Sequence, residues 1–185
     1  KCISTRVNCQ QFVAKKTQKR CFVKNKDIQV FITPSCYKDE HFQLYKQYLN
    51  NRHIDSGMDG SSESDYKNFL ITRWSDTFFV EFRLNNKLLA VAVTDVINNG
   101  LSAVYTYFST DLQFNNRSLG VNAILWQIEE CKRRGLDWLY LGYWILENKK
   151  MSYKNQYQPA EYFINGLWTN DEQTLHNKCE PKKLG

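Results

Sequence analysis

Long hydrophobic runs are missing from this 185-residue sequence. No apolar stretch approaches the roughly 18 residues that a membrane-spanning helix requires. No basic start leads into an apolar segment and a small-residue cleavage site, as a secretory signal would. Disorder is excluded as well, because 15% of the residues are aromatic and the net charge is only +6. We therefore expect a soluble, globular, cytoplasmic protein with no membrane partner.

Closely spaced metal ligands are also absent. None of the six cysteines stands in a C-x-x-C pair and no two histidines form an H-x-x-x-H pair, so a zinc or redox site is not expected. The sequence has no Walker phosphate loop and no G-x-S-x-G elbow, which excludes two large classes of hydrolase. The long gaps between the cysteines do not resemble a small disulfide scaffold. We expect reduced thiols, no metal and no cofactor.

Acidic residues are missing from the first 26 positions. This segment holds eight Lys and Arg residues. The rest of the chain holds 17 Lys and Arg residues against 19 Asp and Glu residues. Two interpretations stay open, because a basic run is often only a solvated face, whereas clustered cations also release counterions from a nucleic-acid backbone. The chain opens with Lys1 and Cys2 rather than methionine, so we expect a processed or truncated start.

Hydrophobic periodicity predicts a mixed α/β domain. Residues 37–53 have aromatic and leucine side chains at helical spacing, with Ser35 as a candidate cap, and a polar Gly/Ser-rich loop follows over 55–64. Three strands joined by asparagine-rich turns predict an antiparallel meander, followed by an amphipathic helix and a strand buried on both faces. These five elements are expected at residues 78–84, 88–97, 101–108, 119–134 and 138–145.

The turn before the second predicted helix is the first candidate site. Arg117, Ser118, Leu119 and Gly120 open this helix, and a glycine in the first turn lets backbone N–H groups approach an anion closely. An R-x-x-G turn between strand and helix resembles the phosphate-binding turn of GNAT-type acyltransferases. Arg117 and Gly120 could equally form an ordinary loop and cap. Asn122 replaces the usual second small residue, which disfavours coenzyme A.

The segment after the last predicted strand carries the most specific signal. The motifs SLGVNAILWQIEE, YLGYWI, KM-x-YK-x-x-Y-x-P-x-E and G-x-W follow one another between residues 118 and 168. This order resembles the aminoacyl-tRNA–protein transferase family. Upstream, Arg52-His53 with Gly57-Met58 resembles the family's R-H and D-G-D-M-like loop, and residues 102–106 resemble its S-x-V-Y-T strand. The resemblance covers nearly the whole chain and is closest to the bacterial aspartate/glutamate leucyltransferases.

The resemblance implies both a fold and a reaction. The fold is GNAT-like, a mainly antiparallel mixed sheet flanked by helices. Residues 1–34 would be the remainder of a basic, cysteine-containing N-terminal module, and residues 35–185 the transfer domain. The reaction moves an aminoacyl group, leucine in the bacterial members, from aminoacyl-tRNA to the N-terminal α-amine of proteins beginning with Asp or Glu, which marks them for N-degron degradation. The family's usual C-x-x-C pair is matched by Cys2 at most, so this chain supports no metal or iron–sulfur centre.

The resemblance also suggests roles for the motif residues. The donor's 3′ end would meet Arg117, Ser118, Leu119, Gly120, Tyr143, Trp144, Tyr153 and Tyr157, although core packing explains any of these aromatic residues equally well. The acceptor carboxylate would meet Arg52, His53, Lys150 and Lys154, and the tRNA backbone Lys15, Lys16, Lys19 and Arg20. No catalytic residue is identified, because an activated ester attacked by an amine of pKa ≈ 7.7–8.0 needs placement more than a strong base.

Three alternatives stay open at this point. The same fold with arginine as donor would make the chain an arginyl-tRNA–protein transferase. Acetyl-CoA as donor would make it a small-molecule GNAT acetyltransferase, an interpretation that Asn122 and the KM-x-YK segment disfavour. A chain that binds charged tRNA without transfer would be a non-catalytic tRNA-binding module.

Overall fold

The computed structural model describes residues 2–52, 62–71, 75–145 and 149–170, and the structural statements below refer to these residues. The strands are β1 (Ile3–Asn8), β2 (Gln29–Pro34), β3 (Asp76–Leu84), β4 (Lys87–Ile97), β5 (Gly100–Phe108), β6 (Trp138–Trp144), β7 (Ala160–Ile164) and β8 (Leu167–Thr169). The helices are α1 (Lys16–Lys24), α2 (Asp39–Arg52), α3 (Glu63–Leu70) and α4 (Leu119–Arg134), with two 3₁₀ segments, η1 (Leu112–Arg117) and η2 (Lys149–Gln156).

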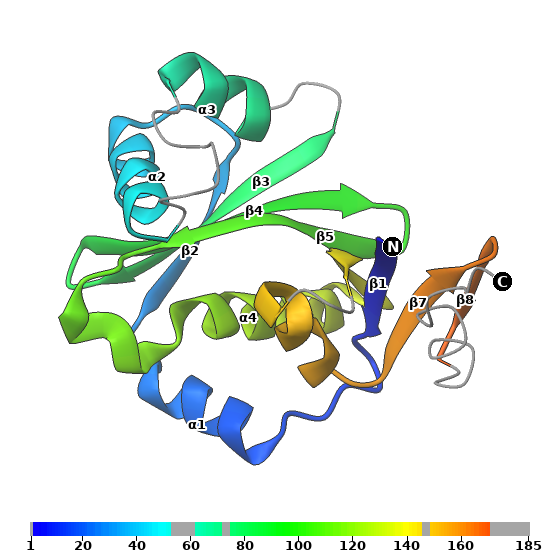
Figure 1. Ribbon diagram of the computed structural model, residues 1–185. Helices are drawn as coiled ribbons and strands as arrows, with labels where there is room; N and C mark the ends of the chain where they lie inside the picture. Colours follow the sequence, from blue (N-terminus) through cyan, green and yellow to red (C-terminus); the bar gives the residue numbers. More distant parts are fainter. Residues whose placement is uncertain (1, 53–61, 72–74, 146–148, 171–185) are drawn as a thin grey trace, which may run out of the picture.

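The described strands form one eight-stranded sheet in the order β2-β3-β4-β5-β6-β1-β7-β8 (Figure 1). All neighbouring strands pair antiparallel except β5 and β6, which are parallel. The predicted fold, a mainly antiparallel mixed sheet flanked by helices, is confirmed. The five predicted elements from 78 to 145 agree with β3, β4, β5, α4 and β6 to within two residues.

Local sequence explains the meander and the helix that follows it. Asn85 and Asn86 both have positive φ, 48° and 65°, as a tight two-residue hairpin between β3 and β4 requires. Gly100 begins β5 where β6 approaches closely, and a Cβ there would lie only 2.4 Å from the carbonyl oxygen of Trp138. Gly135 ends α4 in the left-handed conformation, with its N–H bonded back to the last turn.

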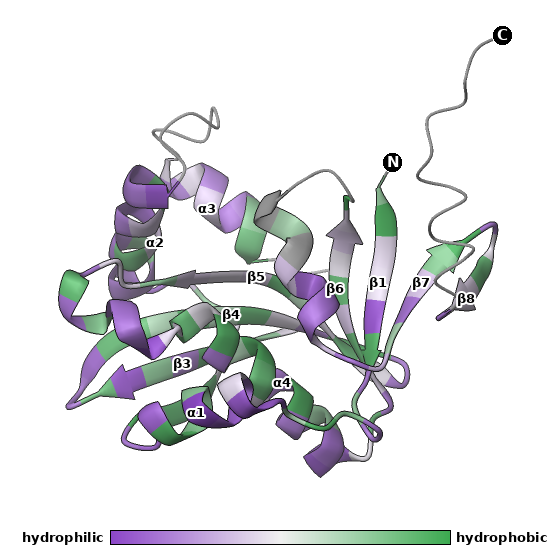
Figure 2. Cartoon of the chain, turned by 60° about the horizontal axis from the view of Figure 1, so that its bottom comes forward, coloured by the Kyte–Doolittle hydropathy of each residue, from purple (hydrophilic) through white to green (hydrophobic). Residues whose placement is uncertain are grey.

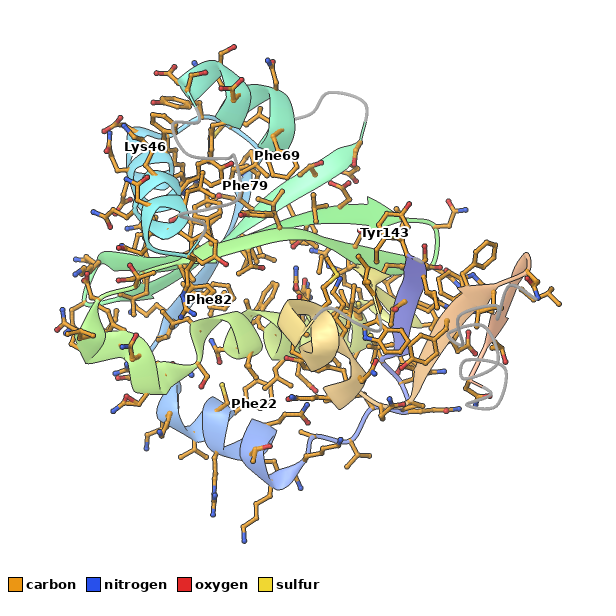
Figure 3. All side chains as sticks on the ribbon, in the orientation of Figure 1. Phe22, Lys46, Phe69, Phe79, Phe82 and Tyr143 are labelled. Atoms are coloured by element: carbon orange, nitrogen blue, oxygen red, sulfur yellow. The ribbon has the colours of Figure 1, made fainter. Side chains whose placement is uncertain are left out.

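Two helical layers cover the β3–β5 half of the sheet. Phe79 points from β3 towards α2 and α3, whereas Phe82 on the same strand points towards α4 (Figure 3). Side chains on these opposite faces of the strand belong to separate hydrophobic clusters. Ser35 does not cap α2, because that helix begins at Asp39; the Ser35 hydroxyl instead donates to the carbonyl oxygen of Leu70 at 3.5 Å.

The other half of the sheet is covered on one side only, and the prediction of a strand buried on both faces at 138–145 is wrong. Leu139 and Leu141 of β6 are buried, but Trp138 and Tyr140 are half-buried and Tyr143 is 60% exposed. The reason is that α2 and α3 lie over β3 to β5 and do not extend across β6, β1, β7 and β8 (Figure 1). Alternate residues of β6 therefore face the helix α4 and an uncovered surface.

The first 34 residues supply two strands to this same sheet. β1 lies between β6 and β7, and β2 pairs with β3 at one edge. The division of the chain at residue 34 stays a prediction, and in the structure this segment is part of the sheet. None of the helices in the described ranges is long and apolar enough to cross a membrane.

Candidate functional site

The candidate site lies where β5 and β6 separate. The two strands pair only through residues 100–102 and 138–140, and then diverge (Figure 2). The segment η2 connects the two sides of this region. On one side, burial and the neighbouring Tyr48 of α2 raise the pKa of the Tyr153 hydroxyl. On the other side, Lys154 donates from Nζ to the carbonyl oxygen of Tyr143 on β6. Predicted site residues from α2, β6 and η2 therefore border one region.

An aromatic group on the β5 side brings α2 and the start of α4 together. We call Tyr48, Arg52, Tyr105, Phe108 and Gly120 the Phe108 cluster. The rings of Tyr48 and Phe108 lie 4.9 Å apart, and the Arg52 guanidinium lies 5.7 Å from the centre of the Phe108 ring. A Cβ on Gly120 would come within 3.1 Å of the same ring, so glycine lets α4 begin directly against Phe108. Within the described residues, the buried Tyr105 hydroxyl has no hydrogen-bond partner.

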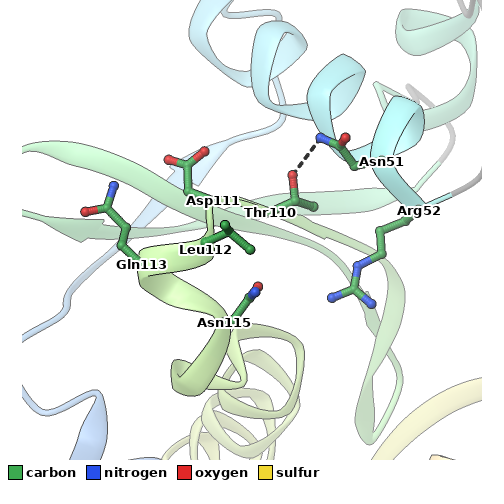
Figure 4. A pocket seen from close by; sticks show the side chains of 7 residues that line it. All are labelled: Asn51, Arg52, Thr110, Asp111, Leu112, Gln113 and Asn115. Carbon is green, nitrogen blue, oxygen red and sulfur yellow. Dashed lines mark hydrogen bonds between the residues drawn. The ribbon is translucent and has the colours of Figure 1, made fainter.

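An open cavity of about 650 Å³ adjoins the Phe108 cluster between the end of α2 and η1 (Figure 4). Its described lining residues are Asn51, Arg52, Thr110, Asp111, Leu112, Gln113 and Asn115. The Asn51 amide donates to the Thr110 hydroxyl oxygen at 2.8 Å, which connects α2 to the segment after β5. Amide, hydroxyl and guanidinium groups therefore dominate this cavity.

Lys154 is the most unusual ionisable residue of the site. Its side chain is 7% exposed, and burial lowers the pKa of its ammonium group. Among the described residues its hydrogen-bond acceptor is the Tyr143 carbonyl oxygen, and no salt bridge to a carboxylate is found there. A buried cation without a counter-charge costs free energy, so this position favours binding of an anion.

The aromatic residues predicted to meet the donor separate into two groups. Tyr143 and Tyr153 are exposed, at 60% and 40%, and border the region between the diverging strands. Trp144 and Tyr157 are buried in the core instead, Trp144 against Tyr162 and Tyr157 against Phe12. Core packing therefore accounts for Trp144 and Tyr157.

The turn before α4 is built much as its sequence suggests, with one change of role. Ser118 is exposed and adopts the left-handed conformation, and Leu119 is buried beneath the first turn. Arg117 forms a bidentate ion pair with Asp27, at 2.7 and 2.9 Å, and donates to the Lys24 carbonyl oxygen. This arginine connects the turn to the end of α1.

The four basic residues predicted to contact the tRNA backbone are all exposed, on or next to α1. Lys16, Lys19 and Arg20 line an open groove of about 610 Å³ together with Val23 and Lys24. Lys15 precedes the helix, and its N–H donates to the Gln18 side chain in a capping box. His53 and the side chain of Lys150 lie outside the described residues. In the described ranges, no group of three or more His, Cys, Asp or Glu residues is arranged to hold a metal ion.

Sequence comparison identifies the family. Residues 40–164 match the family described as arginine-tRNA-protein transferase, C terminus. The chain belongs to this family. It is 48% identical over 172 residues to an aspartate/glutamate leucyltransferase of Alcanivorax borkumensis, covering 93% of this chain and 70% of that protein. It is 46% identical over 167 residues to an aspartate/glutamate leucyltransferase of Pseudomonas fluorescens, covering 90% and 70%. This chain is therefore an aminoacyltransferase, whose substrates are an aminoacyl-tRNA and a protein.

A solved structure agrees with the fold of this aminoacyltransferase. The structure of L-PGS from Bacillus licheniformis superposes with a TM-score of 0.62 at 13% identity, covering 90% of this chain and 57% of that one. Identity this low supports the shared fold alone.

Several residues of the site were not predicted from the sequence. Phe108, which contacts Gly120 and Arg52, was assigned only to a strand, and Thr110 and Asn115 of the cavity were not singled out. A cluster of polar residues between a strand and a helix start, as in Asn115-Asn116-Arg117, is the signal that could have indicated them.

Proposed function

We propose that this enzyme transfers a leucyl group from leucyl-tRNA to the free N-terminal α-amine of cytoplasmic proteins that begin with Asp or Glu, and so marks them for N-degron degradation. The observation that carries the proposal is the 48% identity, over 93% of this chain, to an enzyme named aspartate/glutamate leucyltransferase. The site geometry supports it at three places: the acceptor's carboxylate, the donor's amino acid and the tRNA.

The chemistry is formation of an amide from an ester. The acceptor's α-amine attacks the carbonyl carbon of the aminoacyl ester, a C–N bond forms, and the C–O bond to the terminal ribose breaks. The proton lost by the amine leaves with the ribose oxygen. An α-amine of pKa ≈ 7.7–8.0 is partly unprotonated at neutral pH, so the enzyme contributes mainly placement and electrostatic stabilisation.

Lys154 is the proposed receptor for the acceptor's side-chain carboxylate. Its side chain is only 7% exposed and its ammonium group faces a single carbonyl oxygen among the described residues, so an arriving carboxylate would supply the missing counter-charge. A substrate beginning with Ala brings no such charge. Arg52, His53 and Lys150 were predicted for the same role; the Arg52 guanidinium lies over the Phe108 ring, whereas Lys154 donates to the Tyr143 carbonyl oxygen.

The Phe108 cluster supports leucine over arginine as donor amino acid. Its rings offer an apolar surface, and Tyr153 neighbours Tyr48 at its edge. The Arg52 guanidinium lies over the same ring and would repel a second guanidinium. Ser118, Leu119 and Gly120 at the start of α4, with Tyr143 and Tyr153, would then meet the donor's 3′ end.

A transfer assay with the purified protein tests the proposal. Leucyl-tRNA and arginyl-tRNA are each offered with peptides that begin with Asp, Glu or Ala. Leucine should be transferred to the Asp and Glu peptides and not to the Ala peptide. Transfer of arginine instead, acetylation from acetyl-CoA, or tRNA binding without any transfer would each contradict the proposal and support one of the three alternatives.

The basic face of α1 is the proposed contact with the tRNA backbone. Replacing Lys15, Lys16, Lys19 and Arg20 with Gln should weaken tRNA binding and lower the slope of log affinity against log salt by about 0.7–0.9 for each phosphate that the protein no longer neutralises. All four side chains reach solvent, so the melting temperature should stay unchanged. Unchanged affinity and slope would mean that this segment is only a solvated face.

A further inference from the structure

The cavity beside Arg52 is lined by further hydrogen-bond donors, among them Thr110 and Asn115, that have no assigned role. The Arg52 side chain points into it from α2, and Asn115 points into it from η1 (Figure 4). The Thr110 hydroxyl oxygen accepts the Asn51 amide, which leaves its own hydrogen free to be donated. Asp111 is the one carboxylate among the described lining residues, and it pairs with Lys87 at 2.9 Å. The remaining charge of the cavity is therefore positive.

The segment η1 connects this cavity to the basic face of α1. Asn115 lines the cavity, and the carbonyl oxygen of the next residue, Asn116, accepts a hydrogen bond from Lys24 of α1 at 3.2 Å. Arg117 binds back to the Lys24 carbonyl oxygen at 2.9 Å. The cationic groove of α1 and the cavity beside Arg52 thus lie on two sides of one short segment, and the cavity in turn adjoins Phe108 and the start of α4.

We propose that this cavity binds a phosphodiester in the 3′-terminal single strand of tRNA, through the Arg52 guanidinium with Thr110 and Asn115 as further donors. This assignment rests on the proposed function and gives Arg52 to the donor instead of the acceptor. An arginine in an open cavity suits a polymer that passes through, because its planar fork binds two phosphate oxygens at once. The acceptor's single carboxylate is already matched by the buried Lys154.

The rim of the cavity suits a nucleotide as well. Leu112 is 85% exposed there and offers apolar surface to a ribose or base. The side-chain amides of Gln113 and Asn115 could meet the polar edges of bases. A peptide carboxylate would use neither of these features.

A binding cycle with a chemically altered RNA tests the contact directly. The probe is an uncharged acceptor-stem hairpin that ends in single-stranded ACCA, with one neutral methylphosphonate linkage introduced at each 3′-terminal phosphate in turn. In the wild-type protein, neutralising one of these linkages should weaken binding about tenfold. Arg52→Gln should weaken binding of the unmodified hairpin by a similar factor, lower its salt slope by about 0.7, and remove the effect of that one linkage.

Matched variants separate this contact from a general reduction in positive charge. Lys46→Gln removes one charge from the same helix, outside the residues that line the cavity, and should leave the linkage effect intact. Asn115→Ala should weaken binding of the hairpin about two- to fivefold. The Michaelis constant for a peptide beginning with Asp should not change in Arg52→Gln.

Two results would overturn the assignment. If the linkage effects persist undiminished in Arg52→Gln, this residue does not contact the phosphate. If Arg52→Gln raises the Michaelis constant for the Asp peptide and leaves hairpin affinity unchanged, Arg52 serves the acceptor. The hairpin carries no amino acid, so the binding cycle is independent of leucyl transfer. If the wild-type protein transfers leucine but no linkage has an effect that depends on Arg52, this inference is wrong and the proposed function still stands.

Discussion

Glu81 and Lys154 are both buried ionisable residues, but their surroundings differ. The Glu81 carboxylate on β3 lies 2.5 Å from Lys38, 2.7 Å from Arg83 and 2.9 Å from His41. Burial alone would raise the pKa of Glu81, but these hydrogen bonds outweigh it and lower the pKa to about 2. Lys154 has one carbonyl oxygen as its partner among the described residues, and burial lowers its pKa.

This difference separates a structural charge from one that suits ligand binding. Glu81 is fully compensated by side chains from β3, α2 and the residue before α2, so its role is to hold the helix on the sheet. Lys154 retains the cost of burial without an equivalent stabilising partner in the described part of the protein. Such a group is suited to a substrate that supplies the missing partner.

The largest expected effect is on stability at the Glu81 network. Glu81→Gln should lower the free energy of unfolding by about 4 kcal/mol, because it removes a buried carboxylate that accepts charge-assisted hydrogen bonds from Lys38 and Arg83. Glu63→Gln is the matched control, since it breaks the exposed Glu63–Lys67 pair and should change the free energy of unfolding little. Urea unfolding measures both. Equal effects of the two variants would contradict the structural role of Glu81.

Lys154→Met should give the opposite pattern. The substitution removes a buried charge and keeps the volume, so the free energy of unfolding should hold or rise. Transfer to Asp and Glu peptides should fall roughly 100-fold in kcat/KM, or about 3 kcal/mol of transition-state binding. Binding of uncharged tRNA should not change. A variant that unfolds easily and still transfers at the wild-type rate would make Lys154 a structural residue like Glu81.

The sequence predicted the centre of the fold well, because its signals there are local. Alternation in β3 to β5, the Asn85-Asn86 turn and the Gly135 stop each act within a few residues. The position of β1 could not be predicted in this way. It pairs with β6 and β7, 130 or more residues away in the chain, and such pairing is decided by the assembled sheet.

The motifs name candidate site residues but do not indicate how burial distinguishes them. Arg52 and Lys154 were assigned together to the acceptor carboxylate on the strength of motifs. In the structure the Arg52 guanidinium lies over the Phe108 ring, and the Lys154 ammonium group donates to a carbonyl oxygen of β6. Burial distinguishes the two cations, and it depends on how η2 packs against β6, which no short motif encodes. The same packing explains why Tyr153 is exposed while Tyr157, four residues later, is buried.

The smallest expected effects lie in the pH dependence of stability, where Glu81 and Lys154 should each make stability rise with pH, but in different pH windows. Glu81 has a folded-state pKa below its ordinary 4.5, so its contribution is complete above pH 4.5 and is lost as the pH falls towards 2. Lys154 has a folded-state pKa below its ordinary 10.5. The unfolded chain therefore binds more protons between these two values, and stability should rise with pH in that window.

Urea unfolding of the wild type, Glu81→Gln and Lys154→Met between about pH 3 and pH 10.5 measures these windows. The free energy of unfolding of the wild type should exceed that of Glu81→Gln by less as the pH falls below 4.5. At alkaline pH, the free energy of unfolding of the wild type should rise relative to that of Lys154→Met, by about 1.4 kcal/mol for each unit by which the folded-state pKa of Lys154 is lowered. Protonation of His41 cancels from the comparison with Lys154→Met only, because Glu81→Gln removes the carboxylate that raises the pKa of the His41 imidazole. A Lys154→Met curve parallel to the wild type would mean that Lys154 already has a counter-charge in the folded protein, and the carboxylate site would then have to lie elsewhere.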